Sequence, residues 1–141
     1  MSSDLRSPFD PPLEDMHQMG REVLDFVTSF IDERYDAPSS DYEGAYELAR
    51  RLRVPIPRQG RDLDEVLGTV DSAARKGFDT AAPGFLAYIP GGGLYSAALA
   101  DFIACAINRY TGITAPAPAL TQLESVVLRW ICDLFDFPAE A

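Results

Sequence analysis

The stretch Pro-Gly-Phe-Leu-Ala-Tyr-Ile-Pro-Gly-Gly-Gly-Leu-Tyr, residues 83–95, decides how the chain folds. An apolar, aromatic run is ended here by a proline and three glycines, and a run rich in alanine follows. Glycine and proline interrupt regular structure, so this order predicts a short extended segment over residues 85–89, then a turn. A helix is predicted next, over about residues 94–110. Its short side chains let another backbone approach closely, which favours burial of this helix.

Upstream of this stretch, apolar residues recur three and four positions apart, as on one face of a helix. Residues 13–35 are predicted to form a long helix of this kind. Its stripe includes Met16, Met19, Val23, Phe26, Val27, Phe30 and Ile31. A shorter helix is predicted over residues 42–52. Asp62 with Glu65 has the spacing of a capping box, so a third helix is expected to begin there.

Downstream, a linker over residues 112–118 precedes a last predicted helix, which starts near Pro118 and stops before Pro138. Nearly every expected element is therefore a helix, and the predicted fold class is mainly α. If the chain is a piece of a larger protein, the face formed by the last two helices should be only partly covered, whereas a self-sufficient module should bury it. That face consists of Ala97, Ala98, Ala104, Val126, Trp130 and Ile131.

The composition limits the classes of function. The chain has 141 residues, of which 47% are hydrophobic and 24% charged, as in ordinary globular proteins with one modest core. Its net charge of −10 would repel nucleic-acid phosphates and anionic lipid. No uninterrupted apolar run reaches the roughly 18 residues of a membrane helix. We therefore expect no nucleic-acid partner, no membrane, and a cytoplasmic location.

Isolated motifs give weak functional signals. The glycines at 91–93 precede a helix and could bring backbone N–H groups to an anion, but the flanking residues match neither common nucleotide-binding fingerprint. An anion-binding domain is thus the weakest interpretation, and a turn is favoured. Cys105 and Cys132 lie in apolar helical patterns without further ligands at metal-binding spacing, which favours buried free thiols and no metal. Ser72, Ser96 and Ser125 have no histidine near them in sequence, and His17 lies among charged residues in the first predicted helix, so we expect no catalytic triad.

The order of motifs from residue 83 onward is more specific than any single one. After the deciding stretch come Ala-Leu-Ala-Asp (98–101), Asn-Arg-Tyr-Thr-Gly (108–112), Ala-Pro-Ala (117–119), Gln-Leu-Glu (122–124) and Leu-Arg-Trp-Ile-Cys-Asp (128–133). This series resembles the group II pyridoxal-phosphate decarboxylases, which include aromatic-L-amino-acid, tyrosine, histidine and glutamate decarboxylases. The resemblance covers nearly the whole chain and is strongest from residue 83.

The resemblance implies two domains. Residues 1–82 would form an N-terminal helical dimerisation domain. Residues 83–141 would begin the pyridoxal-phosphate-dependent large domain, an α/β fold of the aspartate aminotransferase type that is otherwise absent and so truncated. The expected partner is a second copy in a homodimer, or a complementary large-domain chain.

The resemblance also implies contact residues for an amino-acid substrate. The turn made by Tyr88, Ile89, Pro90 and Gly91 would line the substrate pocket, and the segment from Tyr110 to Gly112 would reach the pocket from the neighbouring subunit. None of these is a catalytic residue. The family usually has histidine where this chain has Ala82, and often an aromatic residue where it has Thr114.

The implied cofactor is pyridoxal 5'-phosphate, whose ring stores the charge left when carbon dioxide departs. The family's cofactor lysine, ring-pairing aspartate and stacking histidine would lie beyond Ala141. The only lysine is Lys76, at a charged helix end where a solvated ammonium is a poor nucleophile. We therefore expect the N-terminal part of a carboxy-lyase for an amino acid, aromatic by resemblance, which is inactive alone. A non-catalytic helical interaction or dimerisation module derived from such an enzyme is the alternative.

Overall fold

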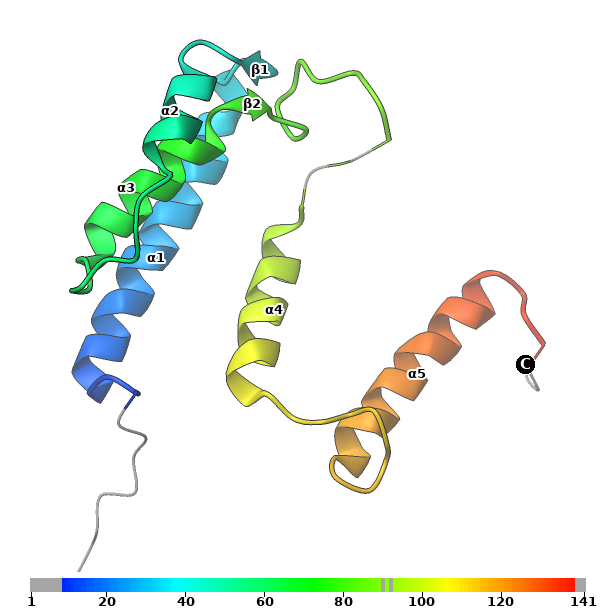
Figure 1. The fold of residues 1–141 in the computed structure, drawn as a ribbon. Coiled ribbons are helices and arrows are strands. Elements are labelled where there is room, and N and C mark those ends of the chain that lie inside the picture. The colour runs from blue at the N-terminus through cyan, green and yellow to red at the C-terminus, as the bar shows by residue number, and fades with distance from the viewer. Residues whose placement is uncertain (1–8, 90, 92, 139–141) are drawn as a thin grey trace, which may run out of the picture. The chain divides into compact units, whose positions relative to one another are not determined.

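The computed structural model describes residues 9–89, 91 and 93–138. The chain divides into two compact units, Met1–Gly92 and Gly93–Ala141. Figure 1 shows that helices make up most of both, which confirms the predicted mainly α fold class. The predicted division into a helical dimerisation domain over residues 1–82 and the beginning of a large domain over residues 83–141 stays a prediction.

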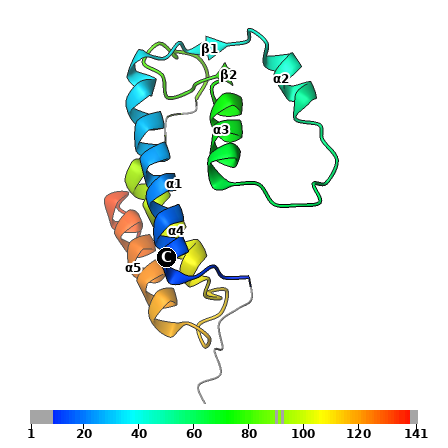
Figure 2. The same cartoon turned by 90° about the vertical axis from the view of Figure 1, so that its left-hand side faces the viewer.

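The first unit is built on the long helix α1 (Leu13–Glu33) and the helix α3 (Leu63–Ala74). These two helices are in contact, and Figures 1 and 2 show them side by side. The short helix α2 (Ala45–Arg51) also contacts α3. Within the apolar stripe of α1, Phe26 and Phe30 stack on each other with ring centroids 6.2 Å apart. The same two side chains line a groove with Leu67 and Gly68 of α3.

The ends of these helices differ in detail from the prediction. The α-helical geometry of α1 stops at Glu33, and the chain continues as a short 3-10 turn, η1 (Arg34–Asp36). Helix α3 begins where predicted, with Asp62 at its N-cap position. However, the Asp62 side chain makes no capping hydrogen bond. The predicted capping hydrogen bond is therefore wrong, although the Asp62 and Glu65 spacing correctly located the start of the helix.

A two-stranded antiparallel ladder, which the sequence did not predict, closes the first unit. Strand β1 (Ser40–Asp41) pairs with β2 (Gly77–Phe78), with Ser40 opposite Phe78 and Asp41 opposite Gly77. Gly77 has a φ of +98°, a conformation that side chains disfavour, so the turn from α3 into β2 depends on glycine. The predicted extended segment over residues 85–89 is wrong, because its last residues form bends.

The second unit contains α4 (Tyr95–Ile107) and α5 (Pro118–Leu134), close to the predicted ranges. Asn108 ends α4 in the left-handed conformation and donates its N–H to the Ala104 carbonyl at 2.9 Å. Asparagine tolerates this conformation better than most residues, which explains its place in the Asn-Arg-Tyr-Thr-Gly motif. Pro118 occupies the first turn of α5, where its missing N–H costs nothing.

The surfaces of α4 and α5 are largely open, and neither helix has a buried residue. The face expected to be only partly covered in a piece of a larger protein is open at two of its residues: Trp130 is 61% and Ile131 48% exposed. The expectation that the alanine-rich helix is buried is therefore wrong for the described chain. Both cysteines are free, but Cys105 is exposed and Cys132 is half-buried, so the prediction that both thiols are buried is wrong.

Across the part of the chain that the structure describes, none of the helices combines the length and apolar character needed to cross a membrane.

Candidate functional site

Four aromatic side chains gather beside the β1–β2 ladder, and we call Tyr42, Phe78, Phe85 and Tyr88 the aromatic cluster. Phe78 is its centre, with ring centroids 5.6 Å from Tyr42, 5.8 Å from Phe85 and 6.3 Å from Tyr88. Phe85 also contacts Tyr88 at 6.4 Å. The Tyr42 and Phe78 rings meet edge to face at 89°, a favoured geometry for aromatic pairs. The cluster therefore connects the ladder with Tyr88, a residue that the sequence singled out.

Two successive turns lead the backbone from β2 to this cluster. The Asp79 carboxylate accepts the N–H of Ala81 at 2.9 Å, and the Asp79 carbonyl accepts that of Ala82 at 3.2 Å. The Ala82 carbonyl then accepts the N–H of Phe85 at 3.0 Å. Ala82 is only 4% exposed, so these turns close tightly around its methyl group. A histidine at this position would have to displace its neighbours, which gives a physical reason for the departure from the family pattern.

Tyr88 has a φ of +61°. For a residue with a side chain, the left-handed conformation costs on the order of 1–2 kcal/mol. An aromatic pair contributes about 0.5–1.5 kcal/mol beyond its buried area. The two ring contacts of Tyr88 are thus large enough to offset its backbone strain. Its side chain is nonetheless 82% exposed, so one face of the ring stays open to solvent.

The neighbours of Tyr88 in the predicted turn are equally open. Ile89 is fully exposed, and a Cβ placed on Gly91 would meet nothing within 4 Å. Pro90, the third predicted contact residue, lies outside the described residues. The described part of this turn is therefore a surface with one aromatic ring and one aliphatic side chain presented outward.

The other predicted contact residues, Tyr110 and Gly112, belong to the second unit. A Cβ on Gly112 would lie 2.8 Å from the end of the Tyr110 ring, so the glycine allows that ring to fold over the backbone. Tyr110 is 65% exposed. The Thr114 carbonyl accepts the N–H of Ala117 at 3.2 Å, which fixes the entry into α5. Whether these residues face the same substrate as Tyr88 stays a prediction.

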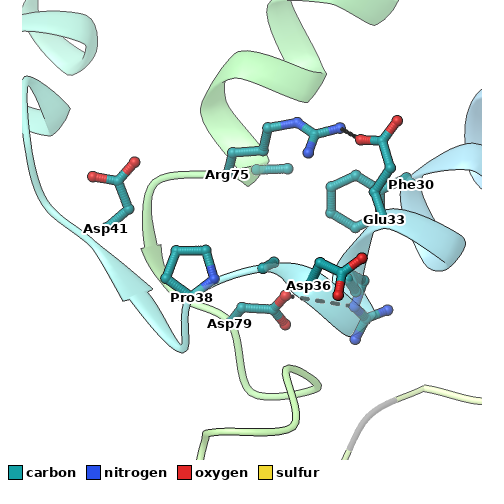
Figure 3. Close-up of a pocket in the computed structure, with 10 residues that line it drawn as sticks. Phe30, Glu33, Asp36, Pro38, Asp41, Arg75 and Asp79 are labelled. Atoms are coloured by element: carbon teal, nitrogen blue, oxygen red, sulfur yellow. Dashed lines mark hydrogen bonds and ion pairs between the residues drawn. The ribbon is translucent and has the colours of Figure 1, made fainter.

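A hollow of about 340 Å³ lies where α1, η1, β1 and the end of α3 meet (Figure 3). Arg75 lines this hollow, and its guanidinium donates to Glu33 at 2.6 Å and to Asp71 at 2.8 Å. The Arg75 guanidinium also lies 5.5 Å from the centroid of the Phe30 ring. Hydrogen bonds from Arg75 to Asp71 and then to Glu33 raise the pKa of the guanidinium. This arrangement links α1 to α3.

The sequence predicted a solvated ammonium for Lys76, but in the structure this side chain forms an ion pair. Its ammonium donates to Asp41 Oδ2 at 2.6 Å, and its side chain is 29% exposed. This hydrogen bond, together with one from the Glu43 N–H, lowers the pKa of the Asp41 carboxyl. The ion pair joins Lys76, the residue before β2, to Asp41 in β1. Lys76 is the only lysine in the sequence.

The described residues do not fit pyridoxal phosphate. Lys76, the only candidate for an adduct, is held by Asp41. A Cβ placed on Gly91 or Gly93 would meet no described atom within 4 Å, so no close neighbour requires glycine there, and Gly92 lies outside the described residues. Within residues 9–89, 91 and 93–138, no group of three potential metal ligands is found. The chemistry of a cofactor is therefore not assigned to these side chains.

Comparison with known proteins gives one consistent result. The family model described as "Pyridoxal-dependent decarboxylase conserved domain" matches residues 46–141. The chain is 26% identical over 132 residues to an aromatic-L-amino-acid decarboxylase of Bacillus atrophaeus, a match that covers 91% of this chain and 27% of the relative. It is 25% identical over 126 residues to the rat enzyme of the same name, covering 88% of this chain and 26% of that protein.

A tyrosine decarboxylase of Narcissus pseudonarcissus is 26% identical over 134 residues, which is 94% of this chain and 25% of the relative. The chain thus spans about a quarter of the length of the curated relatives it matches. No solved structure matches it significantly.

Proposed function

The chain belongs to the pyridoxal-dependent decarboxylase family, and we propose that it forms the N-terminal part of a carboxy-lyase that removes carbon dioxide from an aromatic amino acid. The aromatic substrate is inferred from relatives whose names specify aromatic amino acids or tyrosine. Residues 1–82 would serve dimerisation and residues 83–141 would begin the cofactor domain. The active form would be a homodimer, or a complex with a chain that supplies the rest of that domain.

The observation that carries this proposal is the position of Tyr88. Its ring is supported by the aromatic cluster and is 82% exposed. Beside it, Ile89 is fully exposed. An aromatic side chain of a substrate could lie against these two groups, since rings favour offset or edge contacts with other rings.

In the complete enzyme, bound pyridoxal phosphate supplies the electron sink for decarboxylation. The proposed work of this chain is different: Tyr88, Ile89 and Gly91 contact the substrate side chain and exclude water from it. Tyr110 and Gly112 would do the same from the neighbouring subunit. A water-excluding wall strengthens the electrostatic interactions inside a site, so it would favour loss of the substrate carboxylate.

A second candidate function rests on a separate observation. In the second unit, Phe102 of α4 is 70% and Trp130 of α5 is 61% exposed. Large apolar surfaces of this kind are typical of interaction sites. They favour, as the alternative, a helical interaction or dimerisation module that derives from the enzyme family but is not itself catalytic.

The experiment that tests the proposal is a chimera. Residues 1–141 replace the matching part of the Bacillus atrophaeus relative, and amine release from L-tyrosine and other aromatic amino acids is measured with added pyridoxal phosphate. We expect activity from the chimera and none from the 141-residue chain alone. The matched variant Tyr88→Ala in the chimera should raise KM, because the substrate loses its ring contact. A chimera that dimerises and binds the cofactor but releases no amine would contradict the proposal.

Two further measurements use the isolated chain, one for cofactor attachment and one for the alternative function. The isolated chain is incubated with pyridoxal phosphate, any lysine adduct is trapped with borohydride, and the product is analysed by mass spectrometry. We expect no stoichiometric adduct at Lys76, because Asp41 holds its ammonium. An interaction module would be supported instead if the isolated chain bound a full-length relative while the chimera stayed inactive.

A further inference from the structure

We propose that Phe78 is a positioning residue for the Tyr88 loop: its ring fixes the ring of Tyr88 in the orientation that meets the substrate. This inference rests on the proposed function and adds to it a residue outside the predicted contact segments. Phe78 touches every other member of the aromatic cluster, with centroid distances from 5.6 to 6.3 Å. No other ring in the cluster has three such contacts among the described residues.

Phe78 can hold a neighbour in place because its own backbone is held on both sides. It lies in β2 opposite Ser40, and the next residue, Asp79, donates its N–H to the Ser39 carbonyl at 3.1 Å. The ion pair between Lys76 and Asp41 closes the other end of the ladder at 2.6 Å. The edge of Tyr42 against the Phe78 ring then restricts rotation of that ring.

Tyr88 depends on this support because its backbone has little of its own. No residue from Leu86 to Ile89 forms a backbone hydrogen bond to another described residue. Tyr88 also has a φ of +61°, which its side chain disfavours. The contacts with Phe78 and Phe85 are the interactions that the described residues provide for it. Without the Phe78 ring, the Tyr88 backbone should relax toward an ordinary extended conformation.

The consequence concerns substrate binding more than the chemical step. When Phe78 holds the Tyr88 ring and one face of that ring stays open, the ring is preorganised to contact the aromatic side chain of the substrate. Preorganisation lowers the entropic cost of binding. If Phe78 is lost, the free chain populates other Tyr88 orientations, and the substrate must select the competent one. The apparent affinity falls by the fraction of molecules that remain competent.

The first arm of the test uses the 141-residue chain itself and needs no activity. Proton NMR should show cross-relaxation between the Phe78 and Tyr88 rings. In Phe78→Leu, the Tyr88 ring resonances should move to the values of a solvent-exposed tyrosine, whereas Phe78→Tyr, which keeps the ring, should preserve them. Phe26→Leu is the matched control, since it removes a ring from α1 that does not belong to the cluster. Unchanged Tyr88 resonances in a folded Phe78→Leu chain would overturn the inference.

The second arm uses the decarboxylase chimera and separates this inference from the proposed function. Phe78→Leu should raise KM for an aromatic amino acid by about tenfold, with a smaller change in kcat, and Phe78→Tyr should restore it. An active chimera whose KM is the same with Phe78→Leu overturns the role of Phe78 alone. A folded, cofactor-loaded chimera of unaltered sequence that releases no amine counts against the proposed function itself.

Discussion

The first and second units of the chain differ in what fixes their tertiary structure. In the first, ion pairs join residues far apart in sequence: Glu33 with Arg75 at 2.6 Å and Asp41 with Lys76 at 2.6 Å. In the second, the ion pair between Arg129 and Asp133 at 3.2 Å lies within one helix. The first unit therefore has ion pairs between segments distant in sequence, whereas the helices of the second present apolar faces without a buried residue.

The unit with these long-range ion pairs, Met1–Gly92, is matched by the family model only from residue 46, whereas the whole of Gly93–Ala141 is matched. Polar pairs and rings hold α1, α3 and the ladder together despite the absence of a large buried core: only Ala82 and Ala117 are buried among the described hydrophobic residues. The second unit instead leaves large apolar side chains exposed, among them Phe102 and Trp130. Four changes would break or sharpen this comparison.

The largest effect is expected at Ala82, where the first unit is most tightly closed. Ala82→His inserts a ring where only 4% of the residue is exposed. Overpacking of this kind costs about 1–3 kcal/mol, so the urea midpoint of the first unit should fall. Ala82→Gly is the matched control, because it adds no volume. An unchanged midpoint for Ala82→His would show that the turns around residue 82 are not tightly packed in solution.

The next effect is expected for Arg75→Ala, which removes the link between α1 and α3. Its ion pairs are partly exposed, at 42% for Arg75 and 55% for Glu33, so each contributes at most about 1 kcal/mol. The contact with Phe30 adds about 0.5–1 kcal/mol. We expect a loss of about 1–2 kcal/mol, seen as faster amide hydrogen exchange in α3. Arg51→Ala in α2 should leave that exchange unaltered, and an equal effect of the two variants would disprove the special role of Arg75.

A smaller effect is expected from pH at the ladder. The hydrogen bond from Lys76 lowers the folded-state pKa of Asp41, so the pair stabilises the folded chain above the unfolded pKa of about 3.9. That stabilisation is lost as the pH falls through the lowered value. The protection factors of the amides in β1 and β2, which correct for the intrinsic pH dependence of exchange, should therefore fall below about pH 4, and Asp41→Asn should flatten this dependence. Asp36→Asn is the control. If both variants gave the same pH dependence of exchange, the role of the Asp41–Lys76 ion pair would be contradicted.

The smallest effect on stability is expected for Trp130→Gln in the second unit. Because this side chain is 61% exposed, the free energy of unfolding should change by about 0.5 kcal/mol or less. Binding of a hydrophobic dye and self-association at micromolar concentration should both decrease. Phe30→Gln, placed in the first unit, should destabilise it measurably. A large loss of stability for Trp130→Gln would mean that α5 packs more closely in solution than its exposure indicates.

Local sequence patterns were enough to predict where the helices lie and to identify the family. A period of three to four residues located α1, α3, α4 and α5 to within a few positions, because helical hydrogen bonds join residues close in sequence. Asn108 and Pro118 mark helix ends through their own backbone preferences. The series of motifs after residue 83 identified the decarboxylase family, which the family model confirmed.

Only the tertiary structure decided what surrounds Tyr88. Its partner Phe78 lies in a two-residue strand, too short to produce a periodic pattern. Arg75 meets Glu33 across 42 positions and Lys76 meets Asp41 across 35, so no local spacing could reveal either pair. The positive φ of Tyr88 also turned a predicted extended segment into bends. Contacts between distant segments depend on how helices and turns pack, and that information is spread over the whole chain rather than held in any one motif.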